Sequence, residues 1–107
     1  MSALEFIVPD WPAHAKVRAV TSTRAGGCSA GPYASLNLGA HVGDEPAQVA
    51  ANRAQVATSL ALPAAPVWLQ QVHGVQVVDA AQAAPGATAD GSYTDRAGVV
   101  CAVLTAD

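Results

Sequence analysis

Five side chains of this 107-residue chain are the most suited to metal binding or nucleophilic chemistry: His14, His41, His73, Cys28 and Cys101. His73 is the strongest candidate, because it ends an apolar run on the face shared with Gln71 and precedes Gly74. That position is typical of a site residue at the edge of a sheet. A catalytic zinc takes three protein ligands, however, and no second ligand stands at ligand spacing from His73. From the residues alone, two interpretations of His73 remain open: it is a metal ligand, or it is an ordinary histidine without a metal.

The other four side chains give weaker signals. His41 lies in a glycine-rich segment, where it faces a ligand or caps a turn, and the turn is favoured. His14, flanked by alanines, is expected on an exposed loop. Cys28 has no base beside it in the sequence, which favours a small packing side chain over a reactive thiol. Cys101 stands in a continuous apolar run and is predicted to be a core side chain.

The segment from Arg24 to Gly43 is too rich in glycine for regular structure. Glycine permits positive φ and close approach of the backbone to a ligand. A long irregular segment in a small domain is usually functional or disordered. Interspersed apolar residues favour an ordered, packed loop. The segment lacks the Gly-Lys-Ser/Thr ending of a phosphate-binding P-loop, so its amides and Arg24 are only weak candidates for holding an anion.

A helix is predicted from residue 45 to 61. Asp44 is the expected N-cap, and Pro46 falls in the first turn, where its missing N–H costs nothing. The apolar stripe of this helix is Val49, Val56 and Leu60. Asn52 and Arg53 project within or beside that stripe and need polar partners. Hydrogen bonds to loop carbonyls are favoured; the alternative is that the two side chains brace a site formed by the glycine-rich loop.

The predicted strands are Val17–Thr23, Val67–Val78 with a break at Gly74, and Val99–Thr105, with a shorter candidate at Phe6–Val8. The apolar run 99–105 is typical of a strand buried on both faces. Residues 79–90 are rich in alanine, proline and glycine and are predicted to be a surface connection. The expected fold is α+β: one mixed sheet with the 45–61 helix packed on one side.

Composition narrows the class of protein. Five Lys and Arg against eight Asp and Glu give a net charge of −3 with no basic cluster, which argues against nucleic acid as a partner. No apolar run reaches the roughly 18 residues of a membrane span, and charges and prolines interrupt the first 20 residues where a signal peptide needs an apolar core. Two cysteines outside any Cys-x-x-Cys pair fit a reducing compartment. We therefore expect a single domain without a membrane segment, located in the cytoplasm.

Six segments in order carry a family resemblance: Thr21–Gly27 (TSTRAGG), Gly31–Gly39 (GPYASLNLG), His41–Asp44 (HVGD), Asn52–Arg53, Trp68–Gly74 (WLQQVHG) and Thr105–Asp107 (TAD). Together they resemble the YfiH-like laccase-domain family. Members of that family are also described as multicopper polyphenol oxidoreductases, purine nucleoside phosphorylases and peptidoglycan editing factors. The resemblance runs nearly end to end along this chain.

The resemblance implies that residues 1–107 are the N-terminal half of a layered α/β/β/α sandwich. It also implies a zinc ion held by a histidine, a cysteine and a second histidine, with copper as the alternative metal. His73 matches the first ligand. In the family, the cysteine directly follows a Thr-Ala-Asp like that of 105–107, and the second histidine lies in a later His-Ala-Gly-Trp-Arg-Gly motif. Neither is in this sequence, so we expect a truncated, inactive chain that either exposes sheet or is a marginally stable fragment able to self-associate.

The implied activity is zinc-dependent phosphorolysis of purine nucleosides (inosine, adenosine, methylthioadenosine) with phosphate as co-substrate, together with adenosine deamination. The residues carried over are Asn37 and Arg24 as catalytic, Ser35, Gln71, His41, Gly26 and Gly27 as substrate-binding, and His73 as the metal ligand. A copper polyphenol oxidoreductase is an alternative, which three scattered histidines disfavour. Further alternatives are a peptidoglycan editing factor acting on a mis-aminoacylated wall precursor and a non-catalytic binding fragment.

Overall fold

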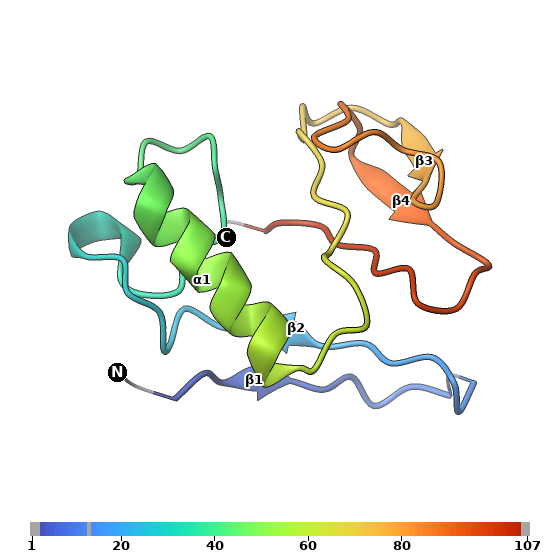
Figure 1. The fold of residues 1–107 in the computed structure, drawn as a ribbon, viewed down its shortest axis with the longest axis horizontal. Coiled ribbons are helices and arrows are strands. Elements are labelled where there is room, and N and C mark those ends of the chain that lie inside the picture. Colours follow the sequence, from blue (N-terminus) through green and yellow to red (C-terminus); the bar gives the residue numbers. More distant parts are fainter. Residues whose placement is uncertain (1–2, 13, 106–107) are drawn as a thin grey trace. The chain divides into compact units, whose positions relative to one another are not determined.

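A computed structural model describes residues 3–12 and 14–105 of the chain. The last two residues of the Thr-Ala-Asp segment, Ala106 and Asp107, lie outside the described residues. The chain divides into two compact units, Met1–Ser59 and Leu60–Asp107, which are described separately below (Figure 1). Over the described part of the chain, no helix has the length and apolar character needed to cross a membrane.

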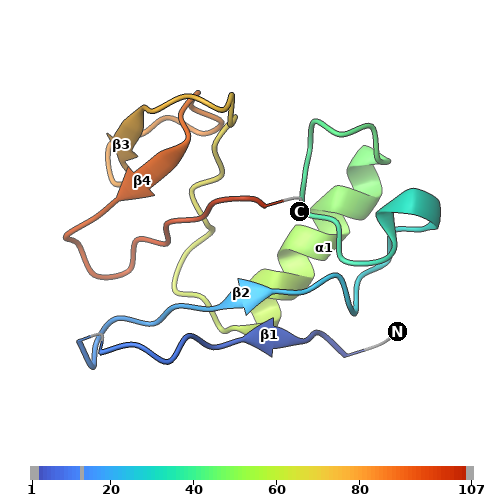
Figure 2. The ribbon, with the colours of Figure 1, turned by 180° about the vertical axis from the view of Figure 1, so that it is seen from behind.

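The first unit begins with a short antiparallel pair. Strand β1 (Phe6–Ile7) pairs with β2 (Thr21–Ser22), with Phe6 opposite Ser22 (Figure 2). The amide of Thr23 extends the pairing by donating to the Glu5 carbonyl at 3.1 Å. The predicted strand 17–23 is therefore shortened to two residues. Pro9 lies just beyond β1 and has no amide to donate to a ladder, so pairing does not extend toward the start of the predicted strand.

Helix α1 (Pro46–Ser59) is the main helix of the chain, as predicted, and Pro46 is its first residue. The Val49 amide donates to the Glu45 carbonyl, so Glu45 precedes the helix and the predicted N-cap at Asp44 is one residue early. The helix ends at Ser59, two residues before the predicted end. Ala61 has a φ of 51°, and a residue in the left-handed region ends an α-helix.

The second unit contains a parallel pair, β3 (Val77–Asp79) and β4 (Gly91–Tyr93). The predicted strand 67–78 is wrong over most of its length, since residues 67 and 70 form only isolated bridges and β3 begins at residue 77. The surface connection predicted for 79–90 is correct only in part: the segment joins β3 to β4 and is exposed at Gln82, at 84–86 and at Thr88, but it also contributes buried residues. Within it Ala80 is 4% exposed and Ala89 is fully buried, because alanine lets two chain segments approach closely.

Residues 99–105 do not form the predicted doubly buried strand. The pairing described for this segment is one parallel bridge between Val67 and Cys101. Cys101, predicted to be a core side chain, is exposed, and Val103 is 58% exposed. A strand buried on both faces needs neighbours along both edges and a layer over each face. The α+β class is confirmed, but the described residues form two separate two-stranded sheets rather than one mixed sheet.

Candidate functional site

The residues predicted to carry function fall in both units. The first unit contains Arg24, Gly26, Gly27, Ser35, Asn37 and His41, and the second contains Gln71 and His73. The sequence predicted them as one site. Each group is described here within its own unit, beginning with the glycine-rich loop.

The glycine-rich loop is organised around Asn52 of α1, whose side chain is fully buried. Its Nδ2 donates to the Ser29 hydroxyl at 2.9 Å and to the Asn37 carbonyl at 2.8 Å. Its Oδ1 accepts from the Cys28 amide at 2.8 Å and from the Cys28 thiol at 3.3 Å. One amide side chain thus ties together two stretches of the loop, which explains how an irregular segment remains ordered.

Arg53 acts in the same way on the next residue of the loop. Its Nε donates to the Leu38 carbonyl at 2.9 Å, and partial burial lowers the pKa of its guanidinium group. The prediction that Asn52 and Arg53 hydrogen-bond to loop carbonyls is confirmed.

Three of the predicted site residues meet at one end of this loop. Arg24 Nε donates to the Ala34 carbonyl at 3.2 Å, while the Ser35 hydroxyl donates to the Arg24 carbonyl at 2.8 Å. The Gly26 amide donates to that same hydroxyl at 3.1 Å. The Arg24 side chain is exposed. The Ser35 hydroxyl and the Gly26 amide are therefore engaged within the loop, and Arg24 is the member of this cluster with an exposed side chain.

Gly27 lies where the loop passes closest to the helix. A Cβ placed there would overlap the Ser35 carbonyl oxygen and lie 2.5 Å from Leu36 Cα and 2.6 Å from Asn52 Oδ1. Two of these neighbours are backbone atoms, which cannot rotate away. Glycine at this position is thus required by close packing.

Gly27→Ala is expected to lower the free energy of unfolding by about 2 kcal/mol, the usual cost of forcing extra volume into a packed site. Gly39→Ala is the matched control, since a Cβ at Gly39 would make ordinary contacts of 3.5 Å or more. Urea unfolding followed by far-ultraviolet circular dichroism measures both. Equal stability of the two variants would contradict the packing argument.

Asn37 and Asp44 form a second polar cluster in the loop. Asn37 Nδ2 donates to Asp44 Oδ2 at 3.1 Å and to the Gly39 carbonyl at 3.3 Å, while its Oδ1 accepts from the Gly39 amide. The Ser29 hydroxyl donates to Asp44 Oδ2 at 2.5 Å. The bond from Ser29, with those from Asn37 and the Glu45 amide, holds the pKa of Asp44 below its ordinary value against the opposing effect of burial.

The lowered pKa of Asp44 predicts a loss of stability in acid. The folded state favours the ionised carboxylate, so its contribution is full above the unfolded pKa of about 3.9 and is lost as pH falls through the lower folded pKa. Urea midpoints measured from pH 6 down to pH 2 are expected to fall more steeply for the wild type than for Asp44→Asn. Glu45→Gln, which changes the exposed neighbour, should retain the wild-type slope. Identical slopes for all three proteins would refute this assignment.

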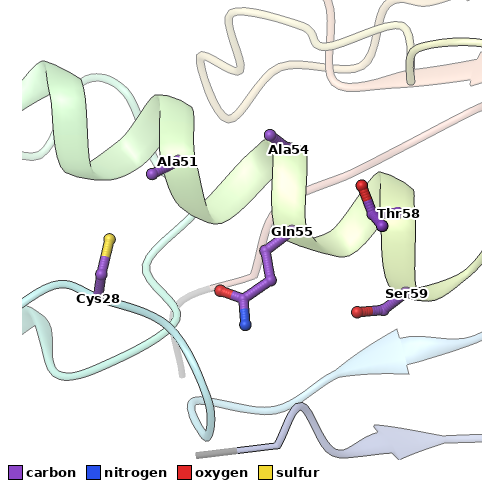
Figure 3. Close-up of a pocket in the computed structure, with 6 residues that line it drawn as sticks. All are labelled: Cys28, Ala51, Ala54, Gln55, Thr58 and Ser59. Atoms are coloured by element: carbon purple, nitrogen blue, oxygen red, sulfur yellow. The ribbon is translucent and has the colours of Figure 1, made fainter. Parts of the chain in front are cut away.

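His41 and Cys28 occupy different surroundings in the first unit. His41 is exposed on the turn that precedes Gly43. Cys28 is half-buried and its thiol also contacts the Gln48 carbonyl at 3.6 Å. It borders an open hollow of about 480 Å³, together with α1 residues (Figure 3): Ala51, Ala54, Gln55, Thr58 and Ser59. These contacts agree with the prediction that Cys28 is a small packing side chain.

His73 stands on a loop whose backbone is held by a carboxylate that the sequence analysis did not single out. The φ of His73 is 60°, in the left-handed region. The amides of Val72 and His73 donate to Asp90 Oδ1, and the Gly74 amide donates to Asp90 Oδ2, each at 2.8 Å. The His73 side chain is exposed. Successive amides around a left-handed residue form a concave binding place for an anion, and here Asp90 occupies it.

The charge state of Asp90 follows from this arrangement. Desolvation acts to raise the pKa of Asp90, but the three amide hydrogen bonds and the charge of His73 together hold it below its ordinary value. Asp90 lies 16 to 18 residues along the chain from the three amides that donate to it. No local spacing rule connects such distant positions; the only sequence signal was the glycine after His73, which permits a tight loop.

Gln71, the other predicted site residue of this unit, makes a paired contact with the main chain. Its Nε2 donates to the Leu104 carbonyl at 3.1 Å, and the Leu104 amide donates to its Oε1 at 2.7 Å. The side chain therefore acts as one rung of a β-ladder, and it fixes the segment that leads into Thr105.

The donor chemistry of His73 fits a metal ion, since an exposed imidazole is a ligand that zinc and copper both accept. Within residues 3–12 and 14–105, no group of three His, Cys, Asp or Glu side chains is arranged to hold a metal. His73 is thus one candidate ligand, and the described residues do not complete a coordination sphere by themselves.

The chain thus combines an α+β fold with an exposed imidazole on a loop that a carboxylate holds. The chain belongs to the family described as multi-copper polyphenol oxidoreductase laccase, whose sequence model matches residues 18–107.

Curated relatives support the same assignment. "Purine nucleoside phosphorylase YfiH" of Escherichia coli (strain K12) is 49% identical over 104 residues, which are 96% of this chain and 43% of that protein. "Purine nucleoside phosphorylase PA4543" of Pseudomonas aeruginosa is 48% identical over 102 residues, 95% of this chain and 41% of that protein. The chain thus spans about two fifths of the length of these relatives.

Solved structures share the fold. Protein NMB0706 of Neisseria meningitidis, assigned to the family model DUF152, superposes with a TM-score of 0.87 at 48% identity, covering 95% of this chain and 42% of that one. YlmD of Geobacillus stearothermophilus superposes with a TM-score of 0.83 at 38% identity, with the same coverage. The small α+β arrangement described above is therefore part of a larger fold in both structures.

Proposed function

We propose that this chain is the histidine-bearing part of a metal-dependent purine nucleoside phosphorylase, with a purine nucleoside and phosphate as substrates. The observation that carries the proposal is the exposed His73 imidazole on its carboxylate-held loop. It stands within a sequence nearly half identical to proteins named for that activity.

His73 is proposed as one ligand of a zinc ion, with copper as the alternative metal. When bound, zinc would act as a Lewis acid on a substrate oxygen or lower the pKa of a bound water. The set of ligands would be completed from outside the described residues, since these hold no group of three His, Cys, Asp or Glu side chains arranged for a metal.

Arg24 and His41 are proposed to contact substrate, because both side chains are exposed. The Arg24 guanidinium has the charge and donor geometry to hold phosphate. Asn37, Ser35 and Gln71 already bond to main-chain groups, and we propose that they act by shaping their loops. Gly26 and Gly27 are proposed to let the loop pass close to its neighbours.

The direct test uses the complete protein that carries this sequence, incubated with inosine and inorganic phosphate. Hypoxanthine and ribose-1-phosphate are the expected products, resolved by chromatography; hypoxanthine released without phosphate would indicate hydrolysis instead. Inosine formed from adenosine reports deamination. The 107-residue chain alone is expected to show no turnover, since no group of three potential metal ligands is arranged together among its described residues. Absence of both products with the complete, metal-loaded protein would refute the proposal.

A copper-dependent oxidation of polyphenols is a second candidate, favoured by the description of the matching family. The same preparation loaded with copper and given a phenolic substrate under oxygen distinguishes the two. Quinone formation without nucleoside cleavage would favour oxidation. A serine-bearing wall precursor in a parallel reaction tests the peptidoglycan editing alternative, and its hydrolysis alone would displace both candidates.

A further inference from the structure

We propose that Asp90 is the positioning residue for His73: its carboxylate fixes the left-handed backbone at residue 73 and thereby sets the direction in which the imidazole is presented. The inference rests on the proposed function of His73 as a metal ligand. It adds a residue that neither the family resemblance nor the comparisons assign.

The first argument is the conformation itself. A non-glycine residue with a φ of 60° lies in a sparsely populated region, and surrounding contacts must hold it there. At His73 those contacts are three consecutive amides directed at one carboxylate group. Without the carboxylate, the amides of Val72, His73 and Gly74 would lose a common acceptor, and the extended conformation would become accessible to residue 73.

The second argument is that Asp90 is itself held in place. Its amide donates to the Gln76 carbonyl at 2.9 Å, on the far side of the loop. The preceding residue, Ala89, is fully buried and donates its amide to the Gln70 carbonyl, on the near side. The loop from 71 to 75 therefore begins and ends on the segment that carries Asp90, so the main chain at Asp90 cannot move away from the loop without breaking these anchors.

The third argument is the fit around the carboxylate. A Cβ placed at Gly74 would lie only 3.0 Å from Asp90 Oδ2. Glycine at 74 thus leaves the space that the carboxylate occupies. Gly74 and the distant Asp90 thus act together: the glycine leaves room for the Asp90 carboxylate, and the carboxylate fixes the backbone of His73.

The test compares Asp90→Ala, Asp90→Asn and a control, Asp95→Asn, in the complete protein. Asp95 is exposed and belongs to the same unit. The substitution Asp95→Asn removes the same charge as Asp90→Asn. The first readout is amide hydrogen exchange at residues 72–74. Asp90→Ala is expected to raise exchange at all three residues. Asp90→Asn keeps one carbonyl oxygen and is expected to raise exchange mainly at Gly74. Asp95→Asn should match the wild type.

The second readout is the visible absorption spectrum of the protein titrated with cobalt(II) alone as a probe of the metal site. Outer groups that orient a ligand typically change metal affinity about 10- to 100-fold. Asp90→Ala is expected to weaken cobalt binding by about tenfold and to change the d–d bands, and Asp90→Asn should restore part of both. Such a change in coordination spectrum would not follow from a uniform loss of stability.

The two readouts separate the inference from the function it rests on. If His73→Ala keeps full cobalt binding while Asp90→Ala exposes amides 72–74, the metal role of His73 fails and the loop role of Asp90 stands. If His73→Ala abolishes binding while Asp90→Ala leaves exchange and spectrum unchanged, Asp90 is not a positioning residue.

Discussion

Replacing His73 with alanine in the complete protein is expected to reduce its zinc content from the wild-type value to near zero. The imidazole is exposed and stands on a loop fixed at three successive amides, so the substitution removes the proposed ligand while the amide contacts that hold the loop remain. A catalytic zinc held by three protein ligands loses most of its affinity when one is removed. Metal analysis by plasma mass spectrometry measures the stoichiometry, and the thermal midpoint of the metal-free proteins verifies that the fold is intact.

His14→Ala is the matched control for this experiment. His14 is also exposed but belongs to the other unit, where its Nδ1 accepts from the Lys16 amide. The control is expected to retain wild-type zinc. Unchanged zinc in His73→Ala would reject the ligand role.

Asn52→Ala is expected to lower the free energy of unfolding of the first unit by about 3 kcal/mol. The substitution leaves the Cys28 amide and the Asn37 carbonyl without their Asn52 partner and removes the bond that the Ser29 hydroxyl accepts, although that hydroxyl still donates to Asp44. An unpaired buried polar group costs about 1–3 kcal/mol, and the loop recovers part of this by admitting water. Denaturant unfolding monitored by circular dichroism gives the difference.

Asn52→Asp resolves which half of the side chain matters. Aspartate keeps an acceptor for the Cys28 amide but loses the donor to the Asn37 carbonyl and adds a buried charge, so it too is expected to destabilise. Gln55→Ala, which removes an amide from the same helix, should change stability by less than about 0.5 kcal/mol. A loss in Asn52→Ala no larger than in Gln55→Ala would mean that the loop is ordered by other contacts.

The helix and its loop contacts were accessible from sequence because their signals are local. Pro46 marks the first turn, and polar residues on an apolar stripe indicate that partners lie opposite. Asn52 could thus be predicted to bind loop carbonyls without knowledge of which ones. The end of the helix was placed two residues late because the left-handed conformation of Ala61 has no marker in its residue type.

The strands were predicted poorly because a strand depends on a partner distant in sequence. The run 99–105 has the composition of a buried strand, yet its described pairing is a single bridge, and Cys101 is exposed. The segment 79–90 lacks apolar periodicity, yet Ala80 and Ala89 are buried because small side chains suit close chain contacts. Composition alone predicts neither the pairing of a strand with a distant partner nor the close contact of two chain segments.

Only part of the candidate site could be predicted, because some of its contacts also join residues that are distant in sequence. His73 was identified from its own neighbourhood, a histidine before a glycine at the end of an apolar run. Asp90 was missed because its role depends on three amides 16 to 18 residues away. The same limit applies to Gln71, whose partner Leu104 lies 33 residues further along the chain.

The contact between Gln71 and Leu104 has an evolutionary consequence, since one member contributes a side chain and the other only its main chain. Position 104 can exchange its side chain for almost any other while the pairing survives, with proline excluded for want of an N–H. Position 71 tolerates little, because a shorter or charged group cannot offer a donor and an acceptor at that reach. Substitutions should therefore accumulate at position 104 while position 71 stays constant. Methods that infer proximity from correlated substitutions would overlook this contact.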